Sequence, residues 1–143
     1  MYVLDTNVLS ELRRPARAHP AVAAWARSEL SASFFLSAIT ILEIEIGILR
    51  IGRRDATTAG MFREWMDTNV LPRFGDRILP IDTSVAVRCA SLHVPDPRSE
   101  RDAFIAATAL THNFTIVTRN TADFAGTGAR LVNPWEFRGQ PTL

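Results

Sequence analysis

Short apolar runs alternate with longer helical segments along this chain of 143 residues, and that alternation constrains the fold more than any other feature. The runs that read as strands are residues 2–4, 34–36, 78–81, 115–118 and 130–132. The segments that read as helices are residues 8–14, 20–26, 41–51, 57–70, 83–93 and 100–112. Strands separated by helices form parallel sheets that are covered on both faces. We therefore predict one domain over residues 1–143, with three α/β/α layers around a central, mostly parallel five-stranded sheet.

Proline and capping residues set the expected ends of these segments. Pro15 should stop the first helix, because a proline disfavours helical backbone in the residue before it. Ser37 and Thr40 are both candidate caps for the helix at 41–51, and Ser99 is the candidate cap for the helix at 100–112. Pro80 predicts that the third strand lies at an edge of the sheet.

The composition is that of an ordinary globular domain, with 47% hydrophobic and 22% charged residues. The formal net charge of +1 does not by itself indicate a nucleic-acid-binding protein. All 16 basic residues are Arg, however, and guanidinium groups suit bidentate contacts with phosphate. The arginine content fits a coding bias as well as phosphate binding, and the groups within residues 13–17 and 50–54 are candidate phosphate-binding patches.

The expected compartment is the cytoplasm. The only cysteine, Cys89, has no partner for an internal disulfide, which favours a reducing environment. No basic leader precedes the first apolar run and Asp5 interrupts it, so a signal peptide is not expected. No apolar stretch reaches the roughly 20 residues of a membrane span, so we expect a soluble protein without a membrane partner.

Four acidic residues fall where this architecture would bring them together. Open α/β sheets bind ligands beyond the carboxyl ends of their strands. Asp5 ends the first strand, and Asp123 follows the fourth strand after a short loop. Asp102 lies in the first turn of the helix that leads into the fourth strand, and Glu43 lies within the most apolar helix.

Each acid also has a purely structural interpretation. Asp5 can cap the helix that follows it, Asp102 can form a capping box with Ser99, and Asp123 can close an Asx turn. A carboxylate within a buried helix is costly unless it is paired or metal-bound, so of Glu43 and Glu45 one should lie nearer solvent.

Taken together, the acids indicate a site for a hard cation. Carboxylates without clustered His or Cys match Mg²⁺ or, as an alternative, Mn²⁺ rather than zinc. The histidines His19, His93 and His112 share no metal-ligand spacing. The chain has neither a Ser-His-Asp order nor a glycine-rich phosphate loop.

Four stretches resemble the PIN-domain nucleases, and within them the VapC-type toxins of bacterial toxin–antitoxin pairs. They read Val-Leu-Asp-Thr-Asn-Val-Leu at 3–9, Ser-Ala-Ile-Thr-Ile-Leu-Glu-Ile-Glu-Ile-Gly-Ile at 37–48, Asp-Ala-Phe-Ile-Ala-Ala-Thr-Ala at 102–109 and Ile-Val-Thr-Arg-Asn-Thr-Ala-Asp-Phe at 116–124. They occur in the family's order and spacing across nearly the whole chain. Residues 9–12 and 134–137 also resemble the FitB-like branch.

The resemblance implies a PIN fold, a homodimer, and a VapB-type antitoxin that forms a hetero-oligomer with the toxin and alone contacts operator DNA. It implies catalytic and metal-binding roles for Asp5, Glu43, Asp102 and Asp123. It favours Glu43 over Glu45, because the family's glutamate stands four residues before the glycine, here Gly47. It implies supporting roles near the site for Thr6, Thr118 and Asn120.

The expected activity is that of a Mg²⁺-dependent endoribonuclease toxin, which hydrolyses RNA phosphodiester bonds by in-line attack of water and is neutralised by its antitoxin. Asp5 and Asp102 would hold one ion, and Glu43 and Asp123 would help to hold a second. From the resemblance and the charges, we expect an antitoxin arginine to enter among the carboxylates and displace metal.

Other functions stay open at this point. The chain can be a PIN-domain nuclease of RNA processing or of DNA, or a toxin-like subunit that works mainly in a DNA-binding autorepressor complex. A metal-assisted phosphatase is disfavoured, because Asn7 occupies the place of its second aspartate.

Overall fold

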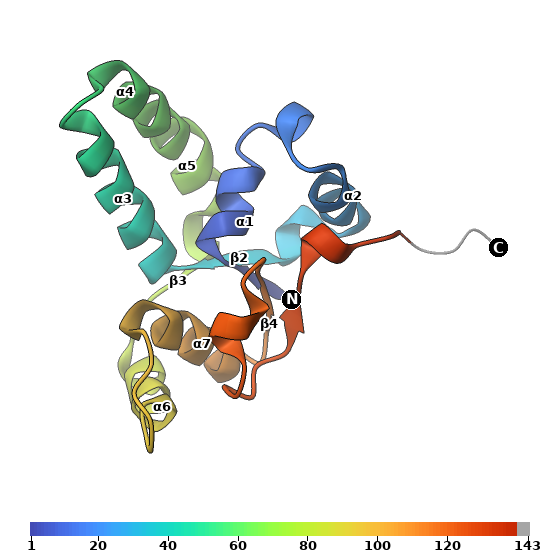
Figure 1. The fold of residues 1–143 in the computed structure, drawn as a ribbon, viewed down its shortest axis with the longest axis vertical. Helices are drawn as coiled ribbons and strands as arrows, with labels where there is room; N and C mark the ends of the chain where they lie inside the picture. Colours follow the sequence, from blue (N-terminus) through green and yellow to red (C-terminus); the bar gives the residue numbers. More distant parts are fainter. Residues whose placement is uncertain (140–143) are drawn as a thin grey trace.

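The computed structural model describes residues 1–139 and contains one five-stranded sheet with the order β3-β2-β1-β4-β5 (Figure 1). The strands are β1 (Tyr2–Leu4), β2 (Phe34–Ser37), β3 (Ile78–Leu79), β4 (Thr115–Val117) and β5 (Leu131–Val132). Every neighbouring pair is parallel, which confirms the predicted sheet. The third strand is shorter than predicted, since it ends before Pro80, but it does lie at an edge.

The α-helices lie between the strands and overlap the predicted helical segments, except the short one at residues 71–74, which lies beyond the helix predicted at 57–70. They are α1 (Thr6–Glu11), α2 (Pro20–Ser28), α3 (Ala38–Gly52), α4 (Ala56–Trp65), α5 (Leu71–Phe74), α6 (Thr83–Leu92) and α7 (Glu100–His112). None of the helices within residues 1–139 combines the length and apolar character that a membrane crossing needs.

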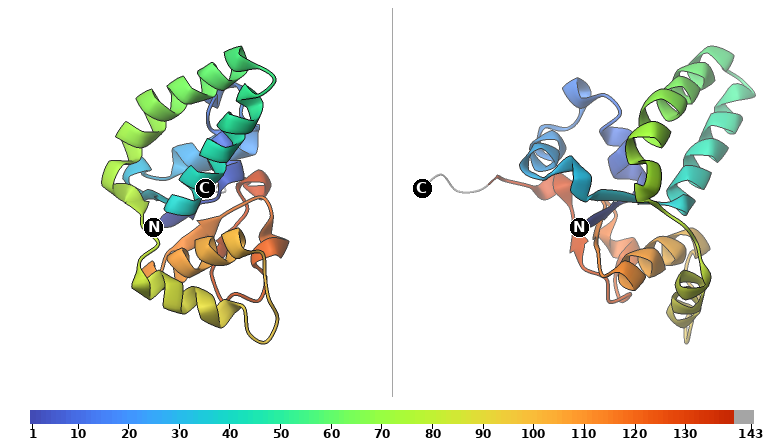
Figure 2. Two further views of the ribbon diagram at one scale, coloured as in Figure 1. Left: turned by 90° about the vertical axis from the view of Figure 1, so that its left-hand side faces the viewer. Right: turned by 180° about the vertical axis from the view of Figure 1, so that it is seen from behind.

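Successive strand residues point to opposite faces, so the sheet has two cores. Leu4, Leu36 and Val117 pack on the face that carries α1 to α5. Val3 and Ile116 pack on the other face, with Ile105 of α7. Figures 1 and 2 show α6 and α7 on one side of the sheet and the other helices on the opposite side, which confirms the three-layer arrangement.

Helices α1 and α3 both begin earlier than predicted, and a side-chain cap explains each start. The Asp5 carboxylate accepts a hydrogen bond from Thr6 N (2.8 Å), so α1 begins directly after β1 rather than at Val8. Ser37 Oγ accepts one from Ile39 N (3.1 Å), so α3 begins at Ala38. The alternative cap Thr40 was wrong, because this residue lies inside the helix.

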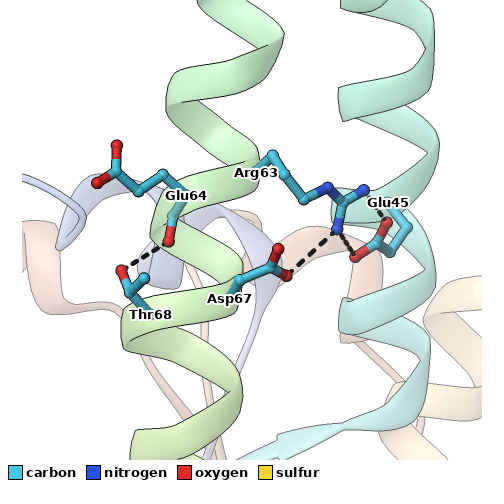
Figure 3. Close-up of polar contacts among 5 residues, drawn as sticks. All are labelled: Glu45, Arg63, Glu64, Asp67 and Thr68. Atoms are coloured by element: carbon cyan, nitrogen blue, oxygen red, sulfur yellow. Dashed lines mark hydrogen bonds and ion pairs between the residues drawn. The ribbon is translucent and has the colours of Figure 1, made fainter.

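The helix predicted at 57–70 is interrupted and extends further, to Phe74. A π-helical turn (Met66–Val70) joins α4 to α5, and Leu71 N donates to the Met66 carbonyl. Thr68 Oγ1 donates to the Glu64 carbonyl (2.7 Å; Figure 3), and Pro72 has no N–H for the carbonyl four residues before it. We attribute the wider turn to these two features.

Candidate functional site

Asp5 is fixed at the carboxyl end of β1, between the sheet and α1. Its backbone N donates to Val117 O (2.9 Å), which continues the β1–β4 pairing. The side chain is only 7% exposed. One carboxylate oxygen caps α1, and the other accepts hydrogen bonds from Thr118 Oγ1 (2.8 Å) and Asn7 Nδ2 (3.2 Å). The capping interpretation is therefore right for Oδ1, while Oδ2 faces the neighbouring strand end.

Thr118 and Asn7 form the support of this carboxylate. The buried Thr118 hydroxyl also accepts from Asn120 N (3.0 Å), so it joins Asp5 to the loop after β4. Asn7 Oδ1 accepts from Arg119 N (3.2 Å), which ties the same loop to α1. Asn120 itself is exposed and contributes its backbone rather than its side chain to these bonds. Sequence reasoning missed Asn7, although its place two residues after Asp5 within the Asp-Thr-Asn motif was a usable signal.

Glu43 joins this group through Thr6. Thr6 Oγ1 donates to Glu43 Oε1 (2.8 Å) and lies 3.3 Å from Thr40 Oγ1, so the first turn of α1 meets the first turns of α3. The buried Thr40 was not predicted to take part in the site. Glu45 turns away from it: both of its oxygens bind Arg63 of α4 (2.8 and 2.6 Å; Figure 3). Of the two glutamates, the structure brings Glu43 to Asp5.

Asp102 comes from the opposite layer. It lies in the first turn of α7, and Ser99 is the N-cap residue of that helix without a side-chain capping bond. The capping-box interpretation of Asp102 was therefore wrong. Residues Ala103, Ala106 and Ala107 are fully buried, and their small side chains let this helix pack closely against its neighbours.

Asp123 lies in a single 3-10 turn (Thr121–Phe124) after β4 and is exposed. The turn is closed by the backbone, with Asp123 N donating to Asn120 O (3.0 Å). Within residues 1–139 its carboxylate makes no hydrogen bond, so the Asx-turn interpretation was wrong. Gly126 turns the chain after it with φ +80°, and a Cβ there would stand 2.9 Å from an Arg98 nitrogen.

These acids act on one another electrostatically. Burial raises the pKa of Asp102, and the charges of Asp123, Asp5 and Glu43 raise it further. Burial also raises the pKa of Asp5, although hydrogen bonds from Thr118, Thr6 and Asn7 oppose that effect. The structure thus brings all the predicted acids together beyond the carboxyl ends of the strands, where their negative charges repel one another.

The donor chemistry fits a divalent hard cation. Among residues 1–139, no three His, Cys, Asp or Glu side chains are grouped closely enough to form a complete protein cage for an ion. Mg²⁺ does not need such a cage, because it keeps several waters and binds to one or two carboxylates plus substrate phosphate oxygens. Asp5 and Asp102 would hold it most directly, because Asp123 is close enough to raise the pKa of both and Glu43 is close enough to raise that of Asp102.

A second feature is an apolar cavity of about 330 Å³ that none of these acids lines. Its walls come from α1, α2 and the helical segment from α4 to α5, and include Leu9, Leu12, Trp65 and Phe74. Arg27 and Arg73 also line it. The cavity suits apolar side chains rather than a metal ion or a phosphate.

Comparison with known proteins places this geometry in a family. The PIN domain family matches residues 2–129. The chain is 36% identical to VapC ribonuclease Y4jK of Sinorhizobium fredii over 95% of its length and 99% of that protein, and 34% identical to toxin FitB of Neisseria gonorrhoeae over 94% and 99%.

Two solved structures agree. The crystal structure of FitAcB from Neisseria gonorrhoeae matches with a TM-score of 0.86 at 34% identity, over 96% of this chain and 100% of that one. FitAB bound to an IR36 DNA fragment matches with a TM-score of 0.85 at 34% identity, over 99% and 100%. With its parallel sheet, its acidic carboxyl edge and these relatives, the chain belongs to the PIN-domain family.

Proposed function

We propose that this protein is the ribonuclease toxin of a VapBC-type toxin–antitoxin pair, a metal-dependent endoribonuclease that uses Mg²⁺ or Mn²⁺. The observation that carries the proposal is the convergence of Asp5, Glu43, Asp102 and Asp123 at one edge of the sheet. Acids that repel one another need a cation, and an RNA phosphate approaching them needs one too. The relative named VapC ribonuclease supports RNA as the substrate class.

When bound, a divalent cation would supply positive charge for the phosphate and would acidify a water for in-line attack. Asp5, at the end of β1, and Asp102, in the first turn of α7, would hold it. Thr118 and Asn7 keep Asp5 Oδ2 in place, and Thr6 does the same for Glu43. The exposed Asp123 lies at the outer side of the group, where it meets substrate and solvent.

The antitoxin partner also belongs to the proposal. The relative named toxin FitB and the FitAB structure bound to DNA support a toxin that assembles with a DNA-binding partner. Apolar side chains of such a partner would fill the cavity beside α1 and α2, and an arginine from it would pair with the carboxylates. The exposed apolar side chains of Leu42 and Leu49 on α3 support the association of two copies of this chain into a homodimer. We propose a cytoplasmic site of action, where the free Cys89 stays reduced.

The test is cleavage of single-stranded RNA by the purified chain with Mg²⁺, with Mn²⁺ and with EDTA. Asp102→Asn keeps the side-chain shape and removes one charge, so we expect cleavage to fall by more than about 100-fold. Asp76→Asn is the matched control. Asp76 is an exposed acid just before β3, at the amino end of that strand and so away from the acids at the carboxyl ends. Unchanged cleavage by folded Asp102→Asn, or cleavage in EDTA, would refute the metal site.

A further inference from the structure

Arg119 is the first exposed residue beyond the buried strand end that supports Asp5. It directly follows Thr118, whose hydroxyl binds the Asp5 carboxylate. Its backbone is held on both sides: Arg119 N donates to Asn7 Oδ1 (3.2 Å), and Arg119 O accepts from Asn133 Nδ2 (3.5 Å). The start of this side chain is therefore fixed relative to the carboxylate site.

The guanidinium of Arg119 rests on an aromatic ring. Its central carbon lies 5.1 Å from the ring centroid of Trp135. The Trp135 backbone N donates to Asn133 Oδ1 (3.0 Å), so the residue that supports the ring also binds the Arg119 backbone. A cation stacked on tryptophan keeps its charge and loses part of its conformational freedom before any ligand arrives.

The N–H groups of this guanidinium are free to bind a ligand. In the part of the chain that the structure describes, ion pairs involve only Arg63, and the Arg119 side chain donates no hydrogen bond. By contrast, Arg77 donates to backbone carbonyls and Arg130 donates to Asn113. Arg13 also stacks, on Phe62, but it lies beyond the end of α1 that is remote from Asp5.

We propose that Arg119 binds a phosphate of the RNA strand next to the scissile one, with Trp135 as its platform. The inference rests on the proposed function, and it names the residue that aligns the strand on the acidic edge. A planar fork can hold two phosphate oxygens at once, and a stacked guanidinium needs little further ordering to do so. The contact also offsets the repulsion between the carboxylates and the strand.

The experiment measures binding of a labelled, mixed-sequence single-stranded RNA to the full chain carrying Asp102→Asn, in Mg²⁺, over a series of NaCl concentrations. Each phosphate contact on a single strand adds about 0.7 to the slope of log K against log salt. We expect Arg119→Ala to lower this slope by about that amount and to weaken binding roughly tenfold at low salt. Arg119→Lys should keep the slope and bind more weakly than the parent. Arg88→Ala is the control, because Arg88 is exposed on α6 beside the opposite end of β4.

An unchanged slope for Arg119→Ala, or an equal loss for Arg88→Ala, would overturn the inference. Because the assay measures binding by an inactive background, its result is independent of cleavage. Metal-dependent cleavage with an unchanged slope would refute the role of Arg119 and leave the proposed function intact. A lower slope without any cleavage by the wild type would uphold the phosphate contact and refute the nuclease.

Discussion

At the end of β4, one hydroxyl group connects three parts of the site. Thr118 is fully buried, donates to Asp5 Oδ2 and accepts from Asn120 N and from Asn7 Nδ2. A β-branched residue suits the end of a buried strand, and its hydroxyl satisfies a carboxylate and a backbone N–H that have little access to water. The position therefore needs both the shape of valine and the polarity of serine.

Thr118→Val tests this requirement, because it keeps the shape and removes the hydroxyl with its hydrogen bonds to Asp5, Asn120 and Asn7. We expect the free energy of unfolding to fall by about 1–3 kcal/mol, the cost of leaving buried polar groups unpaired. RNA cleavage should fall as well, since Asp5 Oδ2 keeps only its bond to Asn7. Urea denaturation and cleavage rates measure the two effects. Thr118→Ser is the control and should retain most of the activity, whereas a loss in Thr118→Ser with none in Thr118→Val would show that packing alone matters.

At the scale of elements, α3 carries two glutamates with opposite surroundings. Glu43 receives a hydrogen bond from Thr6 at the site, and Glu45 binds Arg63 across the α3–α4 pair. Arg63 also lies 3.6 Å from Asp67 (Figure 3). The hydrogen bond from Arg63 lowers the pKa of Glu45 despite partial burial. Residues two apart on a helix point in different directions, so one helix supplies both a site residue and a surface ion pair.

The pair offers a matched comparison of Glu43→Gln with Glu45→Gln. We expect Glu43→Gln to lose most of the metal-dependent cleavage and Glu45→Gln to keep it. Because the folded pKa of Glu45 is lowered, its ion pair stabilises the fold above the ordinary glutamate pKa and is lost as the pH falls through the folded value. Glu45→Gln should therefore lower Tm by about 1–3 °C at pH 7 and by much less at an acidic pH below the folded pKa of Glu45.

Thermal melts at both pH values, with and without 0.5 M NaCl, separate the roles of the two glutamates. Salt should remove most of the Glu45→Gln effect, since the pair is partly exposed. Loss of cleavage by Glu45→Gln with normal cleavage by Glu43→Gln would reverse the assignment.

The sequence predicted which elements form better than it predicted where they begin and where their backbone changes register. Short apolar runs identified all the strands, because a doubly covered parallel sheet needs them. The π-helical turn before Pro72 was not predicted, since the Thr68 hydrogen bond and the missing N–H of Pro72, to which we attribute it, leave no mark on the hydrophobic periodicity of the segment. Helix starts moved by two or three residues because Asp5 and Ser37 act as caps.

At the scale of the whole molecule, topology is the reason that the acids were predictable. Parallel strands have their carboxyl ends on the same side of the sheet, so residues as far apart in sequence as Asp5 and Asp123 come close together there. The resemblance named Thr6, Thr118 and Asn120 as supporting residues, but other supporting groups were not predicted. Asn7 was missed although its place in the Asp-Thr-Asn motif was a usable signal, whereas Thr40 and the Arg119–Trp135 stack depend on side-chain contacts between distant segments, which no short motif encodes.

The same convergence leaves the carboxylates of the folded protein repelling one another, and a bound metal ion should reduce that repulsion. Burial and the neighbouring carboxylates raise the pKa of Asp102, so its charged form lowers stability at neutral pH. A ligand that binds only the folded state at ten times its Kd adds about 1.4 kcal/mol to stability. Saturating Mg²⁺ should therefore raise Tm of the wild type by about 3–6 °C relative to EDTA.

Asp102→Asn should show the opposite pattern in the same thermal melts. In EDTA it should melt a few degrees above the wild type, because removing one charge relieves the repulsion by more than it costs at the start of α7. It should respond little to Mg²⁺, since a main ligand is missing. A wild-type Tm that ignores Mg²⁺, or an equal response from Asp102→Asn, would show that the acidic edge does not bind the ion. A stable but inactive Asp102→Asn would instead mean that this edge gives up stability in order to hold metal.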